Sequence, residues 1–528
     1  MKKFVTLFTD SYKELKSVRT ITTAAMLAAI AIILGMFSID VGSTIRIGFS
    51  SIPNGVCAYL FGPVVGGIFA GGLDVLKYLL KPTGPFFPGL TAVVILAGVL
   101  YGCFYYKKTI TFCFRDDGQG EDGALWKWIQ NGYDTWDKKD TVELNIAPIV
   151  AQEGDYFTKV ALQLADKKTC PDLVCEDTFQ LPNDVSAGYL TKLDDYVKDY
   201  EDWNTSYYES MKKGVTGADG SVYGIPYCTD TRGLWYNRDI LAQAGVISEG
   251  QDWEPKNWND ILDACKAVKE KCPDVVPFWC NSGVATGEAT SMQTYEMLLY
   301  GTGERLLSDD DKWIVKSQGI LDSLNFLQDI YTNGYGPDLS LVLNGQASNT
   351  SAREYLPEGK LAISLDGSWI TGNWTDTGAA PWPEAKDVLG FASMPTSEGQ
   401  DPKTITLAGG WALSIPENAD AKDETFEFIK HLMDPEVYTD AVIAQGNIAT
   451  RQDVAGDETY SAQPFKQIAT EFLESADFRP QNDKYSTVTT SIQTMVESVV
   501  SGTSPEDAMT QYATDVARAV GDDNVTEK

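Results

Sequence analysis

Residues 219–246 read DGSVYGIPYCTDTRGLWYNRDILAQAGV and form the most diagnostic segment of this chain. Soon afterwards comes EPKNWNDILDACKAV (254–268), which has the periodicity of an amphipathic helix. Before the segment lie three β-prone runs, TITFCF (109–114), TVELNIAPI (141–149) and CPDLVCEDTF (170–179). Helical patterns of about 10–15 residues follow the first two runs, so we expect α/β lobes with mostly parallel sheets. Ligands of such sheets bind at the carboxyl ends of the strands.

The length of the chain indicates several domains, and its charge is distributed unevenly along the sequence. Its 528 residues suggest about three domains. Residues 1–108 hold ten Lys and Arg against four Asp and Glu, a balance of +6, whereas residues 109–528 hold 32 against 70, a balance of −38. A segment with this much negative charge repels nucleic acid and anionic membranes. We therefore expect no nucleic-acid partner. Its apolar content and its many Trp and Tyr residues predict that it folds.

The scarcity of histidine limits the chemistry of the chain. The only one, His431, cannot support a Ser-His triad or a zinc site with several histidines. Helical spacing of Phe428, Leu432 and Met433 around it favours a structural role. The nine cysteines include no CxxC pair, which argues against redox and zinc-ribbon motifs. Disulfides and buried free thiols both remain open, and we expect no metal and no cofactor.

The first part of the chain contains three apolar stretches, at 20–37, 52–80 and 86–106. They predict that the chain enters a membrane through residues 20–106. Gly62-Pro63 interrupts the second stretch, so we expect it to form two short spans. This gives four membrane helices, with three as the alternative.

Small residues recur at a spacing of four in this apolar segment, at Ala24, Ala25, Ala28 and Ala29, and at Gly66, Gly67, Gly71 and Gly72. Such spacing lets helices approach closely in lipid, but it is also ordinary in membrane helices, and both interpretations stay open. Asp74 and Lys77 are costly in lipid, so we expect them to pair or to face an aqueous cavity.

The apolar segment resembles the folate-type S component of energy-coupling factor (ECF) transporters. The matching stretches are KELKSVRTITTAAMLAAIAIILG (13–35), STIRIGFSSIPNGVCAYLFGPVVGGIFAGGLDVLKYLL (43–80) and GPFFPGLTAVVILAGVLYG (84–102). The resemblance implies that the alanines of the first helix dock on the transmembrane coupling subunit, and that Arg46, Gly48, Phe49 and Pro53 lie near a vitamin pocket. That family has six membrane helices, and this chain departs from it after the fourth. A vitamin-binding membrane subunit is therefore an alternative function that the absent helices weaken.

Residues 109–528 resemble the family-one extracellular solute-binding proteins. In this resemblance YGIPY (223–227) is the first hinge strand and LWYNRDIL (234–241) opens the second lobe. Five further segments match in order: LPEGKLAISLDGSWITGNW (356–374), GFASMPT (390–396), LAGGWALSIPENADAKDETFEFIKHLMDPE (407–436), GNIATRQDV (446–454) and FRPQNDKYSTVTTSIQTMVESVVSGTSPEDA (478–508).

This second resemblance implies an α/β, two-lobed periplasmic-binding-protein-like fold, preceded by an all-α membrane segment of three to four helices. The implied domains are the membrane segment 1–108, a first lobe of 109–228 plus 396–440, and a second lobe of 229–395 plus 441–528.

A carbohydrate site needs flat aromatic side chains for the apolar faces of the sugar and fixed polar groups for its hydroxyls. Mapped motif by motif, the resemblance places ligand contacts at Asp117, Glu176, Asp177, Tyr227, Asp230, Asp366, Trp369, Gly410, Trp411 and Arg451. We expect Trp369 and Trp411 to be stacking platforms from opposite lobes. Alternatively, Asp117 caps a helix, Asp230 fixes the hinge turn, and Arg451 forms a surface ion pair.

These patterns predict an extracellular binding protein, not an enzyme, that delivers a carbohydrate to an ABC permease. We expect an oligosaccharide. A glycoside hydrolase that uses two carboxylates is the alternative, because so many acidic residues make some suitable pair unavoidable.

The join between the two segments predicts an inconsistent topology. The basic residues between Lys2 and Arg19 predict a cytoplasmic amino terminus, and four crossings then leave the acidic segment in the cytoplasm. Three crossings, or a lipoprotein-like cleavage before Cys103, would place it outside. We expect instead a truncated transporter segment fused, by gene rearrangement or sequence misassembly, to a binding protein without its signal peptide. A single continuous product amplified from source DNA across codons 100–120 would reject misassembly.

Overall fold

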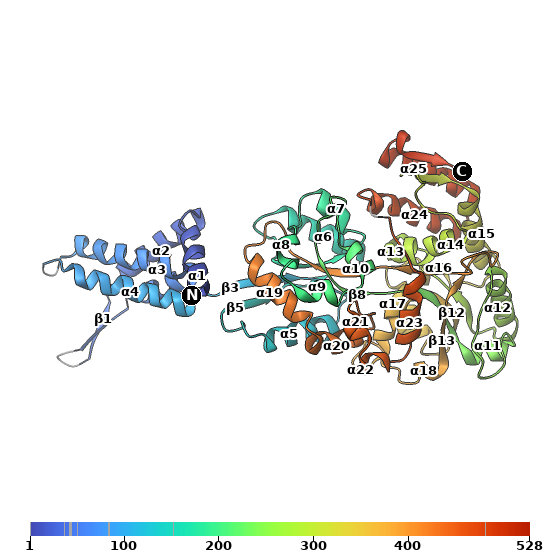
Figure 1. The fold of residues 1–528 in the computed structure, drawn as a ribbon, viewed down its shortest axis with the longest axis horizontal. Helices are drawn as coiled ribbons and strands as arrows, with labels where there is room; N and C mark the ends of the chain where they lie inside the picture. The colour runs from blue at the N-terminus through green and yellow to red at the C-terminus, as the bar shows by residue number, and fades with distance from the viewer. Residues whose placement is uncertain are drawn as a thin grey trace. The chain divides into compact units, whose positions relative to one another are not determined.

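The computed structural model describes residues 2–35, 37–41, 45–49, 51–82, 85–151, 153–480 and 482–528. The chain forms two compact units, drawn in Figure 1. Residues 1–109 with 137–143 form the head, and residues 110–136 with 144–528 form the body. The side chains of residues 2–6 and 38–48 are outside the described set, so the expectation for Arg46 lies outside the described residues.

The head consists of four helices and one hairpin. The helices are α1 (Lys2–Glu14), α2 (Val18–Leu34), α3 (Ile52–Leu80) and α4 (Pro88–Tyr105). Strand β1 (Ser38–Val41) pairs antiparallel with β2 (Ile45–Gly48), a hairpin that the apolar pattern did not lead us to expect. The predicted interruption at Gly62-Pro63 is confirmed, because Gly62 has non-helical φ and ψ and divides α3 into two helical segments joined at a kink.

The bend in α3 lies at Gly62, whose φ of 81° favours glycine. Pro63 follows and has no N–H to donate, which leaves backbone groups of the helix unpaired. The hydroxyl of Ser11 on α1 pairs with them, since it donates to the carbonyl of Phe61 (2.6 Å) and accepts from the amide of Val64 (2.9 Å). This serine therefore pairs the backbone groups freed at the break and ties α1 to α3.

Glycines bring α3 and α4 into close contact. A Cβ on Gly98 of α4 would lie 2.5 Å from the carbonyl oxygen of Gly66, and a Cβ on Gly71 would lie 2.6 Å from a side chain of α4. At these positions the small-residue spacing serves helix packing. Asp74 of α3 accepts a hydrogen bond from Thr91 of α4 (2.7 Å), so it is bound across the same pair of helices.

Among the described residues, α3 and α4 are long and apolar enough to cross a membrane. The helices Leu7–Glu14 and Val18–Leu34 meet at 83° and add a third candidate if they count as one bent span. By length and composition, the described head thus has two candidate spans, or three with the bent pair, compared with our preferred count of four and the alternative of three. On α2, Ala25 and Ala29 are exposed, whereas Ala24 packs against apolar residues of α3 and Ala28 is half-buried.

The body contains two main β-sheets. The first has the order β5-β3-β7-β17-β8 and consists of β3 (Lys108–Cys113), β5 (Val142–Ile146), β7 (Leu173–Asp177), β8 (Ile225–Thr229) and β17 (Gly410–Ser414). The second has the order β10-β12-β9-β13 and consists of β9 (Arg232–Asn237), β10 (Val276–Trp279), β12 (Leu361–Gly367) and β13 (Leu389–Ala392).

As predicted, most strands run parallel: β3, β7 and β8 share one direction in the first sheet, and β10, β12 and β13 share one in the second, while each sheet also has an antiparallel strand. β3 is parallel to β7, and β10 is parallel to β12. In contrast, β17 is antiparallel to β7 and β8, and β9 is antiparallel to β12 and β13. The reason is that β9 follows β8, and β17 follows β13, by passing from one sheet to the other instead of through a βαβ connection.

Helices flank both sheets, as the α/β prediction requires. The larger ones are α5 (Ala124–Thr135), α6 (Glu153–Ala165), α11 (Arg238–Ala244), α12 (Trp258–Lys271), α15 (Gln318–Thr332), α19 (Lys422–Leu432), α20 (Pro435–Ala444), α24 (Tyr485–Val500) and α25 (Pro505–Val520). In Figure 1, α5, α6 and α19 lie with the first sheet, and α11, α12 and α15 lie with the second.

Aromatic residues fill the core beside the second sheet. Trp235 stacks on Phe391 with ring centroids 4.3 Å apart, and Trp279 and Trp374 belong to the same buried cluster. These tryptophans serve the core and are not sugar platforms. All nine cysteines carry free thiols, so the buried-thiol alternative applies to most of them.

Candidate ligand-binding site

A cavity of about 360 Å³ lies in the body. On one side it is lined by residues that follow β3 and β8, by Asp177 at the end of β7 and by Trp411 on β17, all from the first sheet. On the other side it is lined by α13 (Glu288–Thr290), the π-helices η3 (Ser291–Glu296) and η4 (Ser351–Tyr355), and the 3-10 helix η5 (Ser368–Trp374). Its place at strand ends agrees with the expected position of a ligand site.

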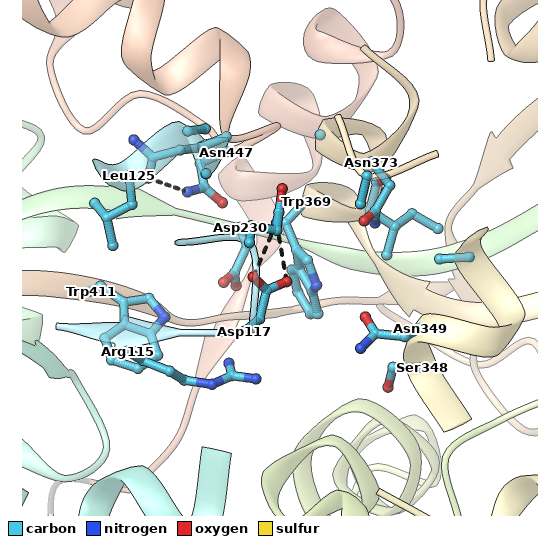
Figure 2. Close-up of a pocket in the computed structure, with 18 of the residues that line it drawn as sticks. Arg115, Asp117, Leu125, Asp230, Ser348, Asn349, Trp369, Asn373, Trp411 and Asn447 are labelled. Atoms are coloured by element: carbon cyan, nitrogen blue, oxygen red, sulfur yellow. Dashed lines mark hydrogen bonds between the residues drawn. The ribbon is translucent and has the colours of Figure 1, made fainter. Parts of the chain in front are cut away.

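Six of the predicted contacts line this cavity: Asp117, Asp177, Tyr227, Asp230, Trp369 and Trp411. The other four, Glu176, Asp366, Gly410 and Arg451, are buried elsewhere in the body. Figure 2 shows Asp117, Asp230 and Trp369 near the middle of the cavity and Trp411 to one side.

Glu176 and Asp366 do not line the cavity with the other predicted contacts. In β7, Cys175 and Asp177 line the cavity, so Glu176 between them faces the opposite side of the sheet. Burial there raises the pKa of Glu176 well above its usual range, and the negative charges of Asp184 and Asp177 add to the shift. Asp366 lies in β12, whose residues are all buried, and burial raises its pKa to about 7.

Gly410 and Arg451 do not line the cavity either, and both have contacts that serve the fold. Gly410 starts β17 with φ of 145°, and a Cβ there would clash with the carbonyl oxygen of Cys228 on the neighbouring strand. Arg451 pairs with Asp202 (2.9 Å) and Asp453 (2.6 Å), and its side chain is only 2% exposed. It is therefore not the surface ion pair that we considered as the alternative, and these contacts favour a structural role.

Trp411 and Trp369 give the cavity aromatic walls from its two sides. Trp411 stacks on Phe157 of α6, with ring centroids 5.9 Å apart and ring planes within 19°. Trp369, in η5, has the guanidinium group of Arg232 at 4.9 Å from its ring centre. A protein group therefore holds each ring in place, as a rigid platform requires. Tyr227 is less available, since it is 4% exposed and packs on an indole of α5.

Asp117 connects the two sides of the cavity. Its carboxylate accepts hydrogen bonds from Arg353 of η4 (2.7 Å) and from Gln119 (3.0 Å). Burial alone would raise the pKa of Asp117, but these hydrogen bonds and the charges of Arg353 and Arg115 hold it below its usual value. The capping alternative does not apply, because the cap of α5 is a glycine and Asp116 is the residue that accepts from the amides of the turn.

Asp177 and Asp230 form buried ion pairs beside the cavity. Asp177 pairs with Arg479 (2.6 Å), which also lies 3.5 Å from Glu288. Burial raises the pKa of Asp177, and the positive charge of Arg479 opposes this shift. Asp230 pairs closely with Arg232 and accepts from a backbone amide (2.8 Å). Because Asp230 lies between β8 and β9, it fixes the crossing between the sheets and also lines the cavity.

Several polar residues of the cavity were not predicted. They are Arg353, Arg479, Asn349, Asn373 and Asn447. Arg479 stands in the FRPQ segment that carried the resemblance, so its motif was an available signal. Arg353 belongs to η4, for which no motif existed. The two π-helices found in the described residues both line the cavity, and π-helices are rare and frequent at functional sites.

The fold of the body is that of solved solute-binding proteins. An ABC transporter solute-binding protein from Thermotoga lettingae, bound with α-D-tagatose, has a TM-score of 0.66 and 24% identity, covering 79% of this chain and 100% of its own. Maltose-bound MalE3 of T. maritima has a TM-score of 0.66 and 21% identity, covering 78% of this chain and 100% of its own. The two-lobed α/β prediction is confirmed.

Residues 119–439 match the bacterial extracellular solute-binding protein family, and the chain belongs to this family. The lactose-binding protein of Rhizobium radiobacter is 20% identical over 61% of this chain and 71% of its own length. The sn-glycerol-3-phosphate-binding periplasmic protein UgpB of Agrobacterium fabrum is 22% identical over 46% of this chain and 53% of its own length.

The head matches a second family. Residues 19–114 match the substrate-specific component of ECF transporters, which confirms the predicted resemblance. The folate transporter FolT of Clostridium novyi is 33% identical over 97 residues, which are 18% of this chain and 56% of that protein. This chain therefore spans about half the length of FolT and of UgpB.

Proposed function

We propose that the body binds a carbohydrate in the cavity and delivers it to an ABC-type permease. The observation that carries this proposal is the presence of Trp369 and Trp411 on the two sides of a cavity that also contains Asp117, Asp177 and Asp230. Aromatic rings stack on the apolar faces of a sugar, and carboxylates accept hydrogen bonds from its hydroxyls. Arginines hold these carboxylates in place, so little ordering is needed when the ligand binds.

Ligand size and class follow from the cavity and from the relatives. A volume of about 360 Å³ is near the lower end of the range of roughly 300–1,000 Å³ for ligand pockets, so we propose a short saccharide rather than a long one. The relatives named for lactose and bound with tagatose support a sugar.

We propose that two lobes, 109–228 with 396–440 and 229–395 with 441–528, close around the ligand. The ion pair of Asp117 with Arg353 (2.7 Å) would hold the closed form, since its partners belong to different proposed lobes. The crossing at Asp230 would act as the hinge. Closure gives a partner permease a shape that differs from the unliganded one.

For the head, we propose attachment to the cell membrane with the body outside. The match of residues 19–114 and the candidate spans support membrane association. We further propose that Ala24, Ala25, Ala28 and Ala29 contact an ECF transmembrane subunit, and the exposure of Ala25 and Ala29 supports this.

We propose binding without catalysis. Glycoside hydrolysis requires a protonated carboxylic acid beside an ionised partner. Arg353 keeps Asp117 in its ionised form, and Asp177, whose pKa burial raises, is paired with Arg479 at 2.6 Å, so neither is placed as a free acid. The names of the matched proteins support the same conclusion.

Calorimetry of the full chain in detergent micelles tests the proposal. The panel contains mono-, di- and oligosaccharides, with amino acids and peptides as controls. We expect heat of binding with at least one short saccharide, whereas heat with only an amino acid or peptide would contradict the proposal. Turnover of a chromogenic glycoside by the same preparation would instead support the hydrolase.

A further inference from the structure

Four arginines line the cavity, and three of them are matched by carboxylates. Arg232 pairs with Asp230, Arg353 with Asp117, and Arg479 with Asp177 and Glu288. In such a pair the positive charge is already balanced, and the guanidinium group orients the carboxylate. The fourth arginine, Arg115, is different.

Arg115 begins β4 (Arg115–Asp116), which pairs in parallel with β6 (Ile149–Val150). Its side chain is half-buried, and its Nε–H donates to the carbonyl of Ala151 at 3.4 Å. Within the described part of the chain, its two Nη groups donate to no protein acceptor and form no ion pair. Figure 2 shows the guanidinium group pointing into the cavity, on the side of Trp411. The Nη donors therefore remain for a ligand.

The nearest carboxylates in the sequence do not require these donors. Asp117 accepts from Arg353 (2.7 Å) and Gln119 (3.0 Å). Asp116 accepts from three backbone amides of the turn that follows it. The charge of Arg115 acts on Asp117 only at a distance, and half-buried Nη donors without an acceptor are unfavourable, so an anion supplied by the ligand would satisfy them.

We propose that Arg115 binds an anionic group of the ligand, a carboxylate or a phosphate, so that the cavity prefers an acidic sugar to its neutral counterpart. This inference rests on the proposed function. A guanidinium group can bind either anion through two parallel hydrogen bonds while the sugar stacks on Trp411 or Trp369. The acidic surface of the body does not prevent binding, because salt screens charges beyond about 8–10 Å and the contact itself is at short range.

Calorimetry of the full chain in micelles compares matched ligands: glucuronate with glucose, galacturonate with galactose, and glucose 6-phosphate with glucose. We expect the acidic member of at least one pair to bind about tenfold or more tightly than the neutral member. Tighter binding of a uronate would identify a carboxylate as the anion, and tighter binding of glucose 6-phosphate would identify a phosphate. Arg115→Gln should abolish the preference and retain binding of the neutral sugar, whereas Arg115→Lys should keep part of it.

Arg518→Gln is the matched control, because it removes an arginine that is 72% exposed on α25 and should leave the preference unchanged. Thermal unfolding shows whether Arg115→Gln is folded. Neutral sugars that bind as tightly as their acids would overturn the inference and leave the proposed function intact. No binding of any saccharide would overturn both. A preference for acids that survives Arg115→Gln would assign the anion to another residue.

Discussion

Replacing Arg451 with methionine should destabilise the body and leave ligand binding unchanged. The Arg451 side chain is 2% exposed, and it holds Asp202 (2.9 Å) and Asp453 (2.6 Å). It also donates to the carbonyl of Met433 (2.9 Å) and lies 5.6 Å from the ring centre of Tyr207. Methionine retains an unbranched chain of comparable length but removes the charge and the donors, so the variant separates polar contacts from packing.

The expected loss follows from the surroundings of these groups. Removing one partner of a fully buried ion pair costs about 3–5 kcal/mol, because the remaining charge has no partner. Asp202 and Asp453 are 35% and 41% exposed, so water can solvate them and the cost is smaller here. The unpaired carbonyl of Met433 adds about 1–3 kcal/mol. We therefore expect a loss of about 2–4 kcal/mol, or a fall in Tm of about 2–5 °C for a body of this size.

Urea unfolding of the full chain in micelles, followed by tryptophan fluorescence, measures this loss. Arg518→Met serves as the control for an exposed arginine and should change the stability by less than about 0.5 kcal/mol. Calorimetry with the saccharide that binds the parent checks the cavity. A variant at Arg451 that keeps its stability but loses the saccharide would refute the structural role and restore the predicted ligand contact.

Further changes test the platforms, the ion pair across the cavity and the response to pH. Trp411→Ala and Trp369→Ala should each weaken saccharide binding by about 1–3 kcal/mol with circular dichroism preserved, and parental affinity in both would remove the stacking role. Asp117→Asn and Arg353→Gln should be coupled by about 0.5–3 kcal/mol in a double-mutant cycle of affinity, whereas additive effects would show that the pair does not support binding. Asp366 has a folded-state pKa of about 7, above its unfolded value of about 3.9, so it lowers stability as the pH rises from about 4 to 7. Asp366→Asn should reduce that fall in the urea midpoint, and an identical pH profile would contradict the burial argument.

The segment 219–246 was informative because it contains the end of one sheet, the crossing at Asp230 and the start of the other sheet. β8 and β9 form where YGIPY and LWYNRDIL predicted them. The break at Gly62-Pro63 was also visible as a pattern, but its consequence was not. Ser11, far away in the sequence, pairs the backbone groups freed at the break and ties α1 to α3.

Local patterns were sufficient for the α/β body, the apolar head and the family of each, because periodicity, charge and motif order are properties of neighbouring residues. Three-dimensional packing was needed to choose among residues of equal chemistry. Glu176 and Asp177 are adjacent carboxylates, and the orientation of β7 in its sheet brings one to the cavity and buries the other. Arg353 reaches Asp117 from a distant part of the chain, whereas Arg115 forms no ion pair with the residues that the structure describes. Such pairings depend on distances between segments that fold together, and no pattern along the chain encodes them.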